Sequence, residues 1–350
     1  ASPPPRCAAV LTVAAPGRAR LDADGATSDV RVEAVGVRQA AALAAGLAAR
    51  ARTAIGVGAD APHGLDALLS DHGTTTGRGL AAPIGIAGGR PFAIDLVADG
   101  PHAIVVGMTG AGKSELLTTW VIALCTRYDP ARVGFLLVDF KGGRAFDALA
   151  RLPHVTGVLT DLDDAAALRA IESLRAELRH RETVLAGVGA RDVAEAGAVL
   201  GRLVVVVDEY AALVAAHPDL HDLFADLAAR GRALGIHLVL SSQRAAGVFR
   251  DAVLANCPLR VSLRVTDRAD SRAVLGVDDA AALSGAAGDR GLALVRRAAD
   301  AAPALVRVAT TAPETVATVA ARPASPARRP WLPALPAVVP LERVRVAGEI

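Results

Sequence analysis

The middle of the chain alternates short apolar runs with longer segments of mixed polarity. Most runs have glycine, proline or a charged residue on at least one side, which is typical of strands buried on both faces of a parallel sheet. We predict such strands at residues 103–106, 133–138, 155–159, 203–207, 236–240 and 259–265.

Helical spacing of apolar residues fills the gaps between these runs. The segment 163–185 places Leu168, Ile171, Leu174 and Leu178 on one stripe. Its other face is charged, and we expect that face to be solvated. The charged residues are Arg169, Glu172, Arg175, Glu177, Arg179, Arg181 and Glu182. Strands alternating with helices predict an α/β fold whose mostly parallel central sheet carries helices on both faces.

Other elements are predicted on either side of this core. They are two N-terminal strands (7–13 and 29–35, with turn-rich 22–28 before the second), a helix at 38–52 and a short helix near 65–69. A hairpin (83–86 and 92–96) and an antiparallel edge pair (291–295 and 305–308) complete the set. We expect an N-terminal β/α segment at 1–60 without evident chemistry, the main domain at 61–310, and a Pro-rich linker toward a following module at 311–350.

The strand at 103–106 runs directly into the pattern Gly, four residues, Gly-Lys-Ser, and a helix follows. This strand–loop–helix context turns the pattern into a phosphate-binding prediction, because glycines let successive N–H groups point at one anion. The helix start adds its positive end. The candidate nucleotide-binding residues are Gly107, Met108, Thr109, Gly110, Ala111, Gly112, Lys113, Ser114 and Glu115. Lys113 would reach the β- and γ-phosphates, and the Ser114 hydroxyl would bind Mg²⁺.

Lysine is scarce in this chain. Only Lys113 and Lys141 accompany 36 arginines. In a chain that uses arginine almost everywhere, a lysine is expected where a compact ammonium is required. Lys141 lies in Asp139-Phe-Lys-Gly-Gly143, directly after an apolar strand. It could bind phosphate, pair with Asp139 or contact a neighbouring subunit, and these alternatives stay open.

The strand at 203–207 ends in Asp208-Glu209. In combination with an upstream phosphate loop, this pair predicts a nucleotidase, with Asp208 on the metal side and Glu209 polarising the attacking water. A strand intervenes between the two motifs, and Glu stands beside Asp, which indicates the RecA-like (ASCE) branch of P-loop ATPases. Gln243 follows the strand at 236–240, where its amide would sense the γ-phosphate.

Composition adds few constraints. The net charge of +2 argues against a nucleic-acid binder driven by electrostatics. Three distant cysteines suggest a reducing compartment without a disulfide framework, and no apolar run is long enough to span a bilayer. His217 and His221 are four residues apart, but Pro218 places His217 outside the following helix, so we expect no metal site there. The Pro-rich ends suggest a piece of a longer chain.

Four separated motifs now agree, and over about residues 83–308 the chain resembles the FtsK/SpoIIIE family. The motifs are the phosphate loop, Val138–Gly143, Val207–Tyr210, and 235–244 with the later Asp-Ser-Arg-Ala-Val-Leu-Gly at 270–276. Within that family the chain is similar to EccC-like type VII secretion ATPases of the actinobacterial FHA/FtsK type, which carry several such modules in tandem. Ser242 stands where the family often has Thr, and Tyr210 where Phe is commoner.

The resemblance implies specific roles. Lys113 and Ser114 hold phosphate and Mg²⁺, Asp208 is the metal-side acid and Glu209 the catalytic base. Gln243 is the sensor, and Arg232 matches the arginine finger that acts on a neighbouring subunit's ATP, with Arg230 as its rival. The implied partners are other modules of the same protein, a hexameric ring and secreted protein substrates. The implied location is the cytoplasmic face of a membrane.

Three functions are compatible with these motifs. The first is an ATP-hydrolysing, Mg-dependent motor module for protein export. The second is a DNA translocase of the FtsK type, which near-neutral charge and the lack of a winged-helix reader disfavour. The third is an ATP-binding assembly switch with little turnover.

Overall fold

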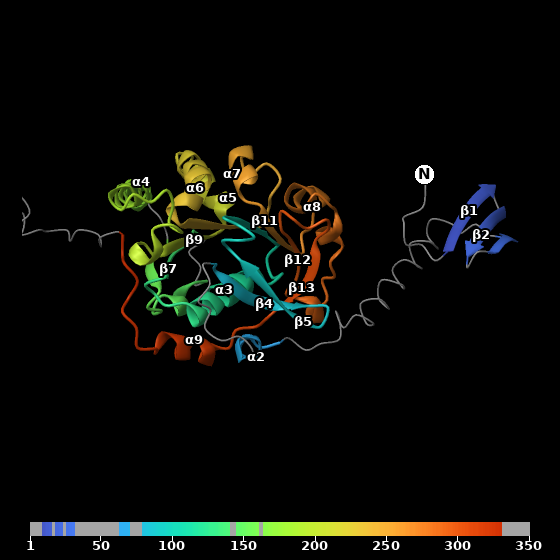
Figure 1. Ribbon diagram of the computed structural model, residues 1–350, viewed down its shortest axis with the longest axis horizontal. Helices are drawn as coiled ribbons and strands as arrows, with labels where there is room; N and C mark the ends of the chain where they lie inside the picture. The colour runs from blue at the N-terminus through green and yellow to red at the C-terminus, as the bar shows by residue number, and fades with distance from the viewer. Residues whose placement is uncertain are drawn as a thin grey trace, which may run out of the picture. The chain divides into compact units, whose positions relative to one another are not determined.

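The computed structural model describes residues 9–15, 18–23, 26–31, 63–70, 79–140, 145–160 and 164–330 (Figure 1). The chain divides into two compact units, Ala1–Gly56 and Val57–Ile350. Their boundary lies close to the one expected at residue 60. The predicted helix at 38–52, Lys141 and the connector from residue 331 onward lie outside the described residues.

The N-terminal unit contains a three-stranded antiparallel sheet. Its strands β1 (Ala9–Ala15), β2 (Arg18–Ala23) and β3 (Ala26–Val30) pair in sequence order. Two strands were expected, and the prediction missed β2 and began the last strand too late. The reason is composition: β2 alternates charged and apolar residues, and only Ala19 is buried on it. An exposed strand of this kind lacks the apolar run that marks the others.

The second unit is built on one ten-stranded sheet with the order β5-β4-β13-β12-β11-β6-β10-β9-β7-β8. The six strands from β11 to β8 are parallel, and the other four are joined antiparallel. The bounds are β4 (Ala81–Ala87), β5 (Arg90–Asp95), β6 (Ala103–Val106), β7 (Val133–Asp139), β8 (Val155–Thr160), β9 (Arg202–Asp208), β10 (Ile236–Ser242), β11 (Leu259–Leu263), β12 (Leu292–Arg296) and β13 (Ala304–Val308).

Helices cover both faces of this sheet, as predicted (Figure 1). On one face lie α2 (Leu65–Ser70), α3 (Lys113–Arg127) and α9 (Pro313–Ala320). On the other lie α4 (Asp164–Gly187), α5 (Tyr210–Ala216), α6 (Leu220–Leu234), α7 (Asp251–Asn256) and α8 (Arg268–Leu275). Alternate residues of one strand enter the two cores: Val105 packs under α3, and Ile104 packs under the opposite helices. This two-sided burial explains the uninterrupted apolar runs.

The antiparallel pair β12–β13 forms, but it does not lie at the edge of the sheet. The β4–β5 hairpin joins the free side of β13 and becomes the edge. Gly85 permits this junction, because a Cβ there would lie 2.1 Å from the carbonyl oxygen of Arg307. The edge prediction was therefore wrong, since sequence alone gave no sign of this long-range pairing.

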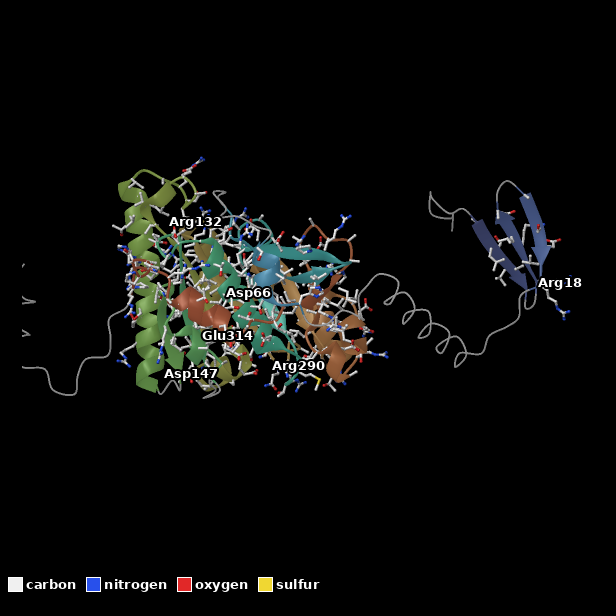
Figure 2. The ribbon with its side chains drawn as sticks, turned by 90° about the horizontal axis from the view of Figure 1, so that it is seen from below. Arg18, Asp66, Arg132, Asp147, Arg290 and Glu314 are labelled. Atoms are coloured by element: carbon white, nitrogen blue, oxygen red, sulfur yellow. The ribbon has the colours of Figure 1, made fainter. Side chains whose placement is uncertain are left out.

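Residues 313–320 were expected to belong to the linker, but they form α9 and pack against α3. Thr315 Oγ1 donates to Asp66 Oδ2 at 2.6 Å, and Figure 2 shows Asp66 of α2 near Glu314 of α9. Further along, Ala327 is buried and its N–H donates to the carbonyl oxygen of Pro153 at 2.9 Å. The folded domain therefore extends beyond residue 310, because Val316 and Val319 complete the core over α3.

The charged face of α4 is not entirely solvated. Glu177 and Arg181 are 2% and 4% exposed, and Arg181 Nε donates to Glu177 Oε1 at 2.6 Å. Arg181 also donates to the carbonyl oxygen of Leu234 at the end of α6, and Arg328 from the tail binds Glu177. Burial lowers the pKa of Arg181, partly offset by Glu177. These two residues therefore connect α4, α6 and the tail.

Removing one member of this buried pair should be costly. We expect Glu177→Leu to lower the free energy of unfolding by about 3 kcal/mol, because the buried Arg181 guanidinium then has no carboxylate partner. The double variant Glu177→Leu with Arg181→Met should recover most of that loss. Urea unfolding followed by circular dichroism measures both. Equal stability of the single and double variants would show that Arg181 does not depend on Glu177.

Candidate functional site

The loop between β6 and α3 has the shape of an anion cradle. Gly110 and Gly112 adopt positive φ angles of +82° and +106°, which glycine tolerates best. A Cβ on Gly112 would also lie 3.2 Å from the Cα of Gly291. The loop is fixed at its start, where Gly107 N donates to Ser242 O and Met108 N to Arg264 O. The amides of Gly110 and Gly112 donate to no acceptor among the described residues, which leaves them available to a phosphate.

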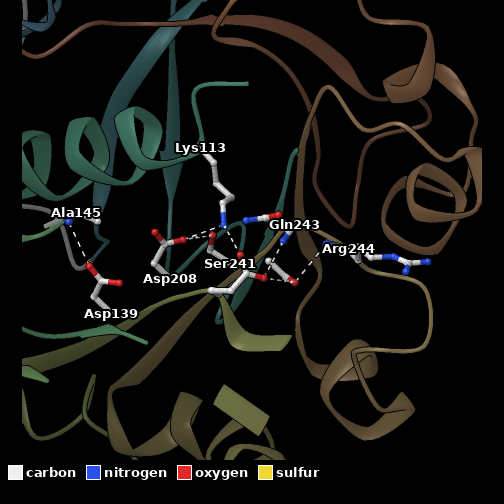
Figure 3. Close-up of polar contacts among 9 residues, drawn as sticks. Lys113, Asp139, Ala145, Asp208, Ser241, Gln243 and Arg244 are labelled. Carbon is white, nitrogen blue, oxygen red and sulfur yellow. Dashed lines mark hydrogen bonds and ion pairs between the residues drawn. The ribbon is translucent and has the colours of Figure 1, made fainter. Parts of the chain in front are cut away.

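Lys113 is the first residue of α3, and its side chain ends between the two acids of β9. Its Nζ lies 2.8 Å from Asp208 Oδ1 and 3.6 Å from Glu209 Oε2 (Figure 3). The three side chains are between 8% and 12% exposed. The sheet order explains the meeting: β10 separates β6 from β9, and all three strands are parallel. The predicted proximity of phosphate loop and acidic pair is therefore present in the fold.

Glu209 is held in an unusual backbone conformation. Its φ of +66° is the only positive value among the described non-glycine residues. Such a conformation costs about 1–2 kcal/mol for a residue with a Cβ. Glu209 Oε1 accepts hydrogen bonds from Ser242 Oγ at 3.4 Å and from Gln243 N at 3.2 Å. The strained turn between β9 and α5 thus aims the carboxylate across the end of β10.

Two serines at the end of β10 complete the contacts of the acids. Ser241 Oγ donates to Asp208 Oδ1 at 3.2 Å, and Ser242 contacts Glu209 as described above. Neither hydroxyl stands out in the sequence as a partner of the acids. The available signal is the Ser-Ser pair directly before Gln243. The N–H of Gln243 donates to the Glu209 carboxylate (Figure 3), and the sensing role of its side chain stays a prediction.

Asp139 ends β7 directly beside Asp208, in register with it. It is 1% exposed, and its Oδ2 accepts a hydrogen bond from Ala145 N at 3.2 Å. Asp139 therefore connects the end of β7 to Ala145. Its pairing with Lys141 stays untested, because Lys141 lies outside the described residues.

Of the two residues that follow Lys113, only Ser114 can offer its side chain to a ligand. Ser114 is exposed in the first turn of α3. The Glu115 carboxylate accepts a hydrogen bond from Thr311 N at 2.9 Å, so its side chain faces the segment that leads to α9. Only the backbone of Glu115 remains for a phosphate. The described residues contain no cluster of three potential metal ligands. One carboxylate and one hydroxyl fit Mg²⁺, which is usually bound through few protein groups together with substrate phosphates.

Arg232 and the phosphate loop lie at opposite ends of the parallel strands. It occupies the last turn of α6, just before β10 begins, whereas the loop follows the end of β6. The Arg232 side chain is exposed and has no hydrogen bond or ion pair within the described ranges. Arg230 is instead bound to Asp226 and Glu182, which raises its pKa. Of the two candidate finger residues, Arg232 is therefore the one whose guanidinium has no partner among the described residues.

The C-terminal half of α6 is anchored to the sheet by a neutral histidine. His102 precedes β6, and its Nε2 donates to Ala228 O at 3.0 Å while Nδ1 accepts from Leu238 N at 2.9 Å. Burial lowers the pKa of His102 to about 4, so the ring keeps this tautomer at neutral pH. A cavity of about 610 Å³ opens beside it and includes Arg202, Arg232 and His237 in its lining. Arg232 is thus presented at the rim of a hollow, on a firmly held helix.

Comparisons with known proteins agree with the motifs. Residues 77–202 match the FtsK/SpoIIIE family model, from before β4 to the first residue of β9. The chain is 36% identical over 217 residues to the type VII secretion system protein EssC of Staphylococcus aureus, covering 58% of this chain. It is 34% identical over 224 residues to the ESX secretion system protein EccC of Geobacillus thermodenitrificans, covering 60%. The chain spans only 14% and 15% of the length of these relatives.

Solved structures give the same answer for the fold. The cytoplasmic domain of the Thermomonospora curvata type VII secretion ATPase EccC superposes with a TM-score of 0.72 at 30% identity, covering 79% of this chain and 36% of that one. EccC ATPases 2 and 3 of the same organism, in complex with a signal sequence peptide, give 0.68 at 27% identity, covering 83% and 57%. The RecA-like P-loop fold is therefore confirmed. No described helix has the length and apolar character needed to cross a membrane.

The ammonium of Lys113 should stabilise the nucleotide-free fold. We expect Lys113→Met to lower the free energy of unfolding by about 3 kcal/mol, because two largely buried carboxylates then face each other without a cation. Adding Asp208→Asn should recover most of the loss, and Glu209→Gln alone should be nearly neutral. Chemical denaturation without nucleotide tests this, and wild-type stability of Lys113→Met would contradict the ion cluster.

Proposed function

Because the chain contains an FtsK/SpoIIIE-type P-loop ATPase domain homologous to EccC and EssC, we propose that it is a motor module driving protein export. The observation that supports this most strongly is the convergence of Lys113, Asp208 and Glu209 at one end of the sheet. The chain carries a candidate residue for each role of such a site, which favours an active ATPase over an assembly switch.

The ion cluster suggests how binding prepares hydrolysis. Without nucleotide, Lys113 neutralises Asp208 and Glu209. A triphosphate in the loop carries more negative charge than the two carboxylates, so the Lys113 ammonium moves to the β- and γ-phosphates. This releases both acids at once. Bound Mg²⁺, held by Ser114 and Asp208, would neutralise charge on the phosphate oxygens.

Glu209 then acts on the attacking water. Its carboxylate is fixed by Ser242 Oγ and Gln243 N, so it need not reorganise when the water arrives. The second of these contacts couples the base to Gln243, which we assign as the γ-phosphate sensor. Release of the phosphate removes the partner of Gln243, and the signal passes along β10 toward its amino end, which Arg232 precedes.

Arg232 cannot serve the phosphate loop of its own chain, because the loop follows the carboxyl end of β6, whereas Arg232 lies just before the amino end of β10. We therefore assign it to the nucleotide of a neighbouring module, as in a ring in which each interface completes one site. The ring, its hexameric form and its position at the cytoplasmic face of a membrane belong to this proposal. An isolated module is then expected to be slow, because association has to supply the finger.

The trans-acting finger predicts a concentration dependence. ATP turnover per chain should rise with protein concentration, and Arg232→Ala should reduce the rate at high concentration by at least about 10²-fold. Glu209→Gln should abolish turnover while ATP still binds. Phosphate release assays measure these rates. Arg230→Ala is the matched control and should stay near wild type, since Arg230 is committed to two surface ion pairs. A flat concentration series with an active Arg232→Ala would disprove the finger.

The polymer that the motor moves can be tested separately. The Thermomonospora relative was solved with a signal sequence peptide, and we propose protein substrates for this chain. Duplex DNA should then leave the ATPase rate unchanged from low to moderate salt. Stimulation that falls steeply with added salt would identify phosphate contacts and favour the DNA translocase instead.

A further inference from the structure

A second cavity of about 220 Å³ borders the phosphate loop on the side away from the acids. Loop residues 108–111 form one wall, and the segment after α8 and the end of β11 form the others. The lining residues used below are Met108, Ala111, Arg264, Gly285 and Arg290. Arg290 borders it from the surface with an exposed side chain (Figure 2).

The order of the strands indicates which part of a bound nucleotide this cavity faces. On one side of β6 lie β10 and β9, whose ends carry Gln243, Asp208 and Glu209. On the other side lies β11, whose end leads to Arg264. The acids mark where the terminal phosphate reacts. A nucleotide gripped by the loop must therefore extend its remaining part toward β11, where the cavity opens.

Arg264 is built into the wall of this cavity. Its carbonyl oxygen accepts a hydrogen bond from Met108 N at 2.9 Å, which fixes its backbone to the phosphate loop. Its guanidinium lies against Gly285: a Cβ there would be 2.0 Å from Nη1 and 2.6 Å from Cζ. The half-buried side chain has no hydrogen bond or ion pair to any described residue. A planar cation is thus held beside the loop without a protein partner.

We propose that this cavity takes the nucleoside of the bound triphosphate and that Arg264 stacks on its purine base, which rests on the ATP-binding function proposed above. No aromatic side chain lines the cavity, so the guanidinium plane is the group available for stacking. An arginine over a π-face is attracted by the ring and is more weakly hydrated than a lysine. Gly285 leaves the room that the guanidinium occupies.

The test compares ATP with inorganic tripolyphosphate, which has the phosphates but no base. Titration calorimetry with Mg²⁺ should show that Arg264→Ala weakens ATP binding about 3- to 30-fold and leaves tripolyphosphate binding unchanged. Arg264→Lys should lose affinity similarly, because charge without a plane cannot stack. The control is Arg268→Ala, an exposed arginine outside the cavity, which should bind both ligands like wild type.

Gly285→Ala provides a second variant with the arginine intact. The added methyl group displaces the Arg264 guanidinium from its position against residue 285. ATP binding should therefore weaken, while the circular dichroism spectrum and the melting temperature stay near wild type. Equal weakening of ATP and tripolyphosphate in Arg264→Ala would make Arg264 a phosphate ligand and overturn the stacking proposal, as would unchanged ATP binding. Failure of the proposed function is distinguishable, since wild type would then bind neither ligand.

Discussion

One buried cation between two carboxylates organises the candidate site. Lys113 comes from the start of α3, and Asp208 and Glu209 come from the end of β9, 95 residues later for the Lys113–Asp208 pair. Because burial makes unpaired charge costly, each partner restricts where the others can lie. The cluster therefore fixes the phosphate loop against the acids before any nucleotide arrives. It also prepares the site for the reaction, because a ligand that binds the Lys113 ammonium frees both acids.

The two ends of the parallel strands carry different functional residues. The carboxyl ends of β6, β9 and β10 hold the ion cluster, whereas Arg232 lies beside the amino end of β10, in the last turn of α6. His102 joins the C-terminal half of α6 to β6 and β10 through two hydrogen bonds that need a neutral ring. Arg181 binds the last carbonyl of the same helix, and through Glu177 it reaches Arg328 of the tail. The tail around Arg328 is thus connected to the helix that carries the candidate finger.

Sequence patterns predicted what depends on local chemistry. Buried parallel strands keep their apolar runs, so β6, β7, β9 and β10 were located within a residue or two, and the phosphate loop was evident from glycine, lysine and serine at fixed spacing. Long-range pairing escaped prediction: the β4–β5 hairpin covers β13, and α9 folds back onto α3. The burial of Glu177 and Arg181 escaped for the same reason, because a charged helix face looks alike whether water or a neighbouring helix covers it. Arg264 escaped because nothing in its local pattern separates it from 35 other arginines.

The most direct test of the account is an experimental structure with a non-hydrolysable ATP analogue and Mg²⁺ bound. We predict that the Lys113 ammonium leaves Asp208 and contacts the β- and γ-phosphates, while Asp208 turns to the Mg²⁺ and Glu209 keeps its contacts with Ser242 and Gln243. An unbroken ion pair between Lys113 and Asp208, with the phosphates bound elsewhere, would contradict the central claim.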